Sequence, residues 1–123
     1  MRTREVCLLI GRDGDVLWSD ESDNAFLLPD SRERWEAIWQ LRAELAEVAH
    51  SHPEGPLGFS AEDESTMSAL TSALGRTLRF SVVAPGGMVA RVDGRDVLVS
   101  EEPWWAEPLR RASGMRHAPM ALA

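Results

Sequence analysis

Two histidines and an aspartate in one short segment are the residues of this sequence best suited to chemistry. His50 and His52 end an alternating run that starts at residue 45, so an extended backbone places both imidazoles on one side. Pro53 ends that strand, and Asp63 falls in the first turn of a following helix. Two imidazoles and a carboxylate can hold zinc and leave a fourth position for water. The spacing therefore predicts a catalytic type of zinc site.

The residues around Asp63 have a second, purely structural interpretation. Ser60 is a good helix N-cap, and an acid three residues later is typical of a capping box, in which serine and acid exchange backbone hydrogen bonds. Capping alone explains this part of the pattern. The two interpretations are compatible, because a capping serine also places the helix that carries Asp63.

The segment resembles the signature of the JAMM metalloproteases, the Jab/MPN domain family, in its prokaryotic Jab-like branch. That signature has His-x-His, seven residues, Ser, two residues and Asp, and residues 53–59 supply the seven here. An acidic residue also precedes the family's early strand, as Glu5 does in this chain. The similarity covers roughly residues 4–100 in outline and is tight over residues 50–63. It implies a single-domain α/β fold with a mixed sheet flanked by helices, related in outline to cytidine deaminases.

The resemblance also assigns roles to individual residues. One Zn²⁺ ion would be held by His50, His52 and Asp63, with Glu5 as general base and Ser60 steadying the oxyanion. Glu21 is an alternative base, because it is acidic and lies in a predicted loop. The reaction implied is hydrolysis of a peptide or isopeptide bond after the C-terminus of a small ubiquitin-like or sulfur-carrier protein, which would be the partner.

Three other classes compete with this interpretation. A non-catalytic MPN-type scaffold or interaction module predicts a broken metal set, and here the set is complete. A DNA-repair-associated branch of similar motif is disfavoured by the net charge of −7, because nucleic-acid partners need a basic surface. A zinc deaminase needs a Cys-x-x-Cys pair, and the chain has one cysteine, Cys7.

Apolar spacing and turn residues predict the elements that position the motif. Apolar or alternating runs predict strands over 6–10, 15–18, 45–50, 78–83, 88–92 and 95–99, with the run at 78–83 half-buried. Helices are expected after Asp30 or Ser31, from Ser60 to the stop at Gly75, and over residues 103–112. The segment 20–29 is loop-like. The order β-β-α-β-α-β-β-β-α indicates a mixed sheet with helices packed on it.

Length and composition set the remaining expectations. The 123 residues, 44% hydrophobic, suit one domain over 1–112, with a flexible C-terminal tail over 113–123. A single cysteine, no signal peptide and no long apolar run favour a cytoplasmic protein that spans no membrane. All 13 basic residues are arginine, which base composition can explain. The oligomeric state stays open.

The aromatic residues and the cysteine are expected to be mostly structural. The tryptophans assigned to the core are Trp18, Trp35 and Trp39. Trp104-Trp105 is either an exposed partner-binding pair or part of the helix packing. Cys7 lies in an apolar run and is predicted to be a small buried hydrophobe.

Overall fold

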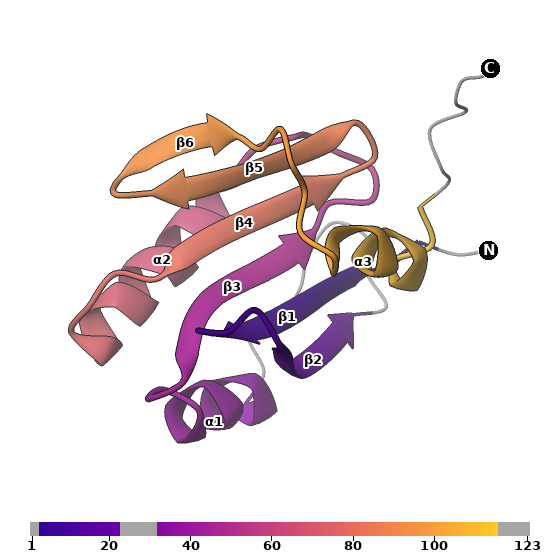
Figure 1. The fold of residues 1–123 in the computed structure, drawn as a ribbon. Helices are drawn as coiled ribbons and strands as arrows, with labels where there is room; N and C mark the ends of the chain where they lie inside the picture. The colour runs from indigo at the N-terminus through magenta and orange to yellow at the C-terminus, as the bar shows by residue number, and fades with distance from the viewer. Residues whose placement is uncertain (1–2, 23–31, 116–123) are drawn as a thin grey trace, which may run out of the picture.

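The computed structural model of the protein describes residues 3–22 and 32–115. In these residues six strands and three helices follow one another in the predicted order (Figure 1). The strands are β1 (Glu5–Gly11), β2 (Val16–Ser22), β3 (Leu45–Ser51), β4 (Arg79–Ala84), β5 (Gly87–Val92) and β6 (Arg95–Leu98). The helices are α1 (Arg32–Gln40), α2 (Ala61–Leu74) and α3 (Ala106–Ala112).

The described strands form a single mixed sheet in the order β2-β1-β3-β4-β5-β6. Only β3 and β4 pair in parallel, and α2 is the crossover that such a pair requires. The other neighbours are antiparallel, and Asp93-Gly94 joins β5 to β6 as the hairpin signal predicts. The protein is therefore a small single-domain α/β protein with a mixed sheet, as expected.

Helices cover both faces of this sheet. Ile38 of α1 and Leu70 of α2 pack with Leu9 and Phe80 on one face, whereas Leu109 of α3 packs with the opposite face. Every residue of β1 is buried, which explains why its sequence is a continuous apolar run rather than an alternating one. Cys7 is buried in this strand as predicted.

Helix α2 has the predicted start and stop. Ser60 is the N-cap and its side chain accepts the backbone N–H of Asp63. Gly75 ends the helix with a φ of 69°, in the left-handed region that favours glycine, and its N–H donates to the carbonyl of Thr71. The expected caps of α1, Asp30 and Ser31, lie outside the described residues.

Three local predictions are wrong. Strand β4 is buried on both faces from Phe80 to Ala84, because α3 covers the face that alternation assigns to solvent. Strand β2 continues to Ser22, into the segment predicted as a loop, because it pairs along β1. Trp39 is 53% exposed, and the guanidinium of Arg42 lies 4.0 Å from the centre of its ring.

The C-terminal region packs against the start of the chain. Helix α3 begins at Ala106, three residues later than expected. Ser113 and Met115, which the sequence assigns to the tail, are both buried, and the Ser113 carbonyl accepts the N–H of Arg4. Packing therefore continues to Met115, and the rest of the predicted tail lies outside the described residues.

The two adjacent tryptophans have different environments. Trp105 is buried in the core under α3, which confirms the packing interpretation for that residue. Trp104 is 64% exposed, and its indole N–H donates to the Gly14 carbonyl at 3.0 Å. In the described part of the chain, no helix has the length and apolar character needed to cross a membrane.

Candidate metal centre

The end of β3 presents the two histidines to the face of the sheet that carries α1 and α2. His50 lies within β3, and the N–H of His52 donates to the Val83 carbonyl at 2.8 Å, which holds the next residues beside β4. The imidazole centroids are 4.8 Å apart with an edge-on arrangement. Both rings therefore lie on one side, as their two-residue spacing predicts.

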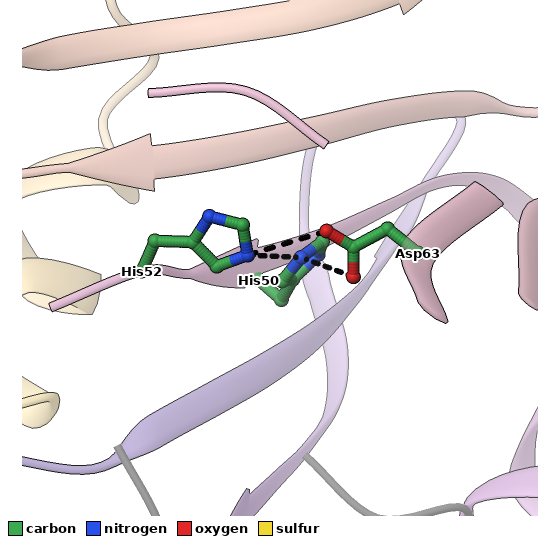
Figure 2. A group of neighbouring side chains, drawn as sticks. All are labelled: His50, His52 and Asp63. Carbon is green, nitrogen blue, oxygen red and sulfur yellow. Dashed lines mark hydrogen bonds and ion pairs between the residues drawn. The ribbon is translucent and has the colours of Figure 1, made fainter. Parts of the chain in front are cut away.

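Asp63 reaches the histidines from the first turn of α2. Its Oδ1 lies 3.0 Å from His50 Nε2, and its Oδ2 lies 3.2 Å from His52 Nε2. The two Nε2 atoms are 3.1 Å apart (Figure 2). The capping box is formed as well, because Ser60 N donates to Asp63 Oδ2 at 2.8 Å and Asp63 N donates to Ser60 Oγ at 3.1 Å. The capping box and the close approach of Asp63 to both histidines are therefore present in the geometry at once.

The His52 ring is oriented by the loop that follows it. Its Nδ1 lies 3.0 Å from the Pro56 carbonyl oxygen. A carbonyl only accepts, so Nδ1 carries the hydrogen and the neutral ring keeps its lone pair on Nε2. Metal-bound histidines commonly use such a bond to fix their tautomer. The His52 lone pair thus belongs to the nitrogen that faces His50 and Asp63.

The electrostatics keep Asp63 ionised. Burial opposes its charge, but hydrogen bonds with His50 and His52 outweigh burial and hold the pKa of the carboxyl well below its usual range. Burial alone would lower the pKa of His52, but the protonated ring donates from both nitrogens, to Asp63 and to the Pro56 carbonyl, and these bonds raise the pKa. A metal ligand must be deprotonated, and the Asp63 carboxylate meets that condition at neutral pH.

The three side chains fit a divalent ion of the zinc type. One donor atom from each of His50, His52 and Asp63 lies within 4.8 Å of the others. Ligand atoms about 2.0–2.1 Å from a tetrahedral ion lie about 3.3 Å from each other. Three separations of 3.0–3.2 Å are close to that value: between the two imidazole Nε2 atoms, between His50 Nε2 and Asp63 Oδ1, and between His52 Nε2 and Asp63 Oδ2. Two imidazole nitrogens and a carboxylate oxygen also form a donor set that zinc accepts.

The proposed base lies in the same cavity as this triad. Glu5 is the first residue of β1, is 4% exposed, and lines a cavity of about 550 Å³ together with His50, His52 and Asp63. Ser60 also lines it. The structure thus brings all five predicted site residues to one cavity, although Glu5 is separated from the others by 45 residues or more of sequence.

The alternative base is placed differently. Glu21 is exposed on β2, lies 3.6 Å from an Arg4 nitrogen, and does not line the cavity. Glu62 does line it, but as an exposed residue in the first turn of α2, where the helix dipole favours an acid. Burial beside the triad therefore favours Glu5 over both.

No protein-family model matches the chain, and no curated protein matches it. The JAMM interpretation therefore rests on the motif and on the geometry of its residues.

Sequence reasoning missed two residues that hold the site together. Ser51, between the histidines, is fully buried, and its Oγ accepts the N–H of Val6 at 2.9 Å, which ties the residue after Glu5 to the end of β3. A small polar residue inside an apolar strand was the available signal. Arg91 is the second residue that holds the site together. It lies on β5, and nothing in the neighbouring sequence indicates that it contacts α2.

Arg91 contacts residues on both sides of the Ser60–Asp63 capping box at the start of α2. Its guanidinium donates to both Glu64 carboxylate oxygens, at 2.5 and 2.8 Å, and to Asp96 of β6 at 2.6 and 3.1 Å. The same group lies 4.8 Å from the centre of the Phe59 ring. Phe59 precedes Ser60 and Glu64 follows Asp63, so these contacts flank the segment that carries Asp63.

Proposed function

We propose that this protein is a zinc-dependent hydrolase of the JAMM type that cleaves peptide or isopeptide bonds. The observation that supports the proposal is the meeting of the triad, Ser60 and the buried Glu5 at one cavity. Such a convergence of a metal set, a carboxylate and a hydroxyl matches the requirements of metal-assisted amide hydrolysis.

Each residue has a distinct role in this proposal. His50, His52 and Asp63 hold the zinc ion, which when bound supplies Lewis-acid polarisation of a carbonyl and lowers the pKa of water. Glu5 accepts a proton at its carboxylate and later delivers it to the leaving amine. The Ser60 hydroxyl accepts the Asp63 N–H and still has its own proton to donate to a developing oxyanion.

The proposed substrate is the C-terminus of a small ubiquitin-like or sulfur-carrier protein. This part of the proposal comes from the family resemblance. An extended tail can lie along a groove or add to an exposed strand edge, and the folded part of a carrier supplies further contact area. With a net charge of −7, the enzyme favours a neutral or basic carrier face, and salt should slow the capture.

Metal analysis tests the site itself. Wild-type protein should bind one zinc ion, His52→Ala should lose it, and His117→Ala, which changes the remaining histidine, should keep it. Equal zinc in wild type and His52→Ala would refute the ligand assignment.

Turnover tests the role of Glu5. Glu5→Gln should keep zinc and lose turnover by about 10²–10⁴-fold, because general acid–base catalysis contributes that much. Glu21→Gln is the matched control and should keep its turnover, because Glu21 does not line the cavity. Zinc binding with no turnover on any carrier fusion ending in Gly-Gly would favour the non-catalytic scaffold.

A further inference from the structure

The cavity at the metal centre extends well beyond the residues that carry the chemistry. It lies between α1 and α2 on one face of the sheet, with exposed residues lining it at the start of α2 and buried ones further along that helix. Six apolar side chains from two helices and two strands make up this further part. They are Trp35, Ile38, Val48, Met67, Leu70 and Phe80.

A partly open cavity of this size differs from a packing void inside a core. All six side chains belong to the core cluster on this face or pack against it. Protein interiors contain few voids larger than a water molecule, because each void forfeits dispersion contacts. Ligand pockets, by contrast, span about 300–1,000 Å³ and have apolar walls with a few convergent polar groups. The volume of about 550 Å³ and the polar end at the triad fit that second description.

The inner part of the cavity is mainly apolar even though two charged side chains lie in its walls. Glu5 and Arg34 are both buried, and both already interact with other groups of the protein. The buried thiol of Cys7 contributes a further weakly polar surface, and burial raises its pKa to about 12. An occupant of the inner part therefore meets mainly apolar atoms.

We infer that this cavity binds a bulky apolar side chain, of leucine to phenylalanine size, on the substrate residue next to the scissile bond. The inference rests on the proposed function. On the carrier side of the scissile bond, the two terminal glycines have no side chain that could fill the cavity. The apolar side chain therefore belongs to the residue that the cleavage releases, and the substrate class is a carrier whose Gly-Gly is followed by an apolar residue.

Binding to the zinc-free protein tests the cavity without any chemistry. The probe is phenylalaninamide, which resembles the released residue, and glycinamide is its control. In protein labelled at the methionine methyl groups, the NMR signal of Met67, which lines the cavity, should shift with phenylalaninamide only. Met88 is buried in the core on the opposite face and serves as the internal reference. No shift at Met67, or an equal shift at Met88, would overturn the inference.

A filling substitution adds a second test. Thr66 is half-buried on α2, lines the cavity and lies three residues after Asp63, so Thr66→Trp should occupy the space and abolish the Met67 shift. Ser68→Trp places the same side chain at an exposed position of α2 that does not line the cavity, and it should keep the shift. Loss of the shift in both variants would show a general disturbance of α2 and would count against the cavity.

Hydrolysis separates this inference from the proposed function. For carrier fusions in which Gly-Gly is followed by phenylalanine or by glycine, kcat/KM should be about 10- to 100-fold higher with phenylalanine, as expected for burial of one large apolar side chain. Thr66→Trp should remove the preference. Hydrolysis of both fusions at equal kcat/KM would overturn the inference and leave the hydrolase intact. A Met67 shift without hydrolysis of any fusion would instead refute the proposed function, and with it the assignment of the bound side chain to a substrate.

Discussion

The hydroxyl of Ser51 connects the strand that carries Glu5 to the strand that carries the histidines. Ser51 is fully buried between His50 and His52, and its Oγ accepts the backbone N–H of Val6 at 2.9 Å. Ser51→Ala removes that acceptor and leaves a buried donor without its partner. We therefore expect both a loss of stability and a looser placement of Glu5.

The size of the stability loss in Ser51→Ala follows from the Val6 N–H, which loses its acceptor. A buried N–H that loses its partner costs about 1–3 kcal/mol. The matched control is Ser113→Ala, because Ser113 is also fully buried, but its Oγ donates to the Leu109 carbonyl. In Ser113→Ala, the Leu109 carbonyl still accepts the backbone N–H of residue 113, so no buried group loses its last partner. The loss of stability should therefore stay below about 1 kcal/mol.

Urea unfolding of the two variants measures the difference. The free energy of unfolding should fall by about 1–3 kcal/mol for Ser51→Ala and by less for Ser113→Ala. Zinc binding by Ser51→Ala should persist, because its three ligands are unchanged, whereas turnover should fall by up to about 10²-fold if Glu5 moves by about 1 Å. Equal destabilisation by the two variants, with full turnover in Ser51→Ala, would refute the reasoning.

Three further perturbations have defined outcomes. Arg91→Met should weaken zinc binding about three- to tenfold in a zinc titration, because the start of α2 loses its ion pairs and its aromatic contact. Burial raises the pKa of the Glu47 carboxyl in the folded state, so its contribution to stability is present below the ordinary glutamate pKa and is lost as pH rises through the folded pKa. Urea unfolding at about pH 4 and about pH 7 should therefore show a smaller loss of stability for Glu47→Gln than for wild type. Cys7, buried and with a pKa raised to about 12, should react with iodoacetamide at pH 8 only after urea unfolds the protein.

Elements with local signals could be predicted from the sequence. The capping serine and the terminal glycine of α2, and the Asp93-Gly94 hairpin, each depend on a few neighbouring residues, and all three are confirmed. Two of the wrong predictions concern burial, which depends on distant elements. Strand β4 is buried on both faces because α3, from the far end of the chain, covers the second one. Trp39 is exposed although its neighbour on α1, Ile38, is buried.

The same distinction applies to the candidate site. His50, His52 and Asp63 lie within one strand–loop–helix unit, so their spacing alone indicates that they meet. Glu5 was assigned only through the family resemblance, since nothing local to it indicates which strand it pairs beside. Arg91 could not be found at all, because its contacts to the start of α2 exist only once β5 has joined the sheet.

Asp63 shows why the capping pattern and the metal pattern occupy the same residues. Its Oδ2 accepts the Ser60 N–H at 2.8 Å, and this bond together with the returning Asp63 N–H fixes the carboxylate relative to the helix start. Oδ1 is then held 3.0 Å from His50, and Oδ2 lies 3.2 Å from His52. A capped aspartate therefore loses little side-chain freedom on binding an ion, since the folded helix has already ordered it. In this chain the Ser-x-x-Asp spacing thus caps α2 and would also preorganise Asp63 for the proposed ion, whereas a carboxylate at any other position of the first turn would lack one of the two.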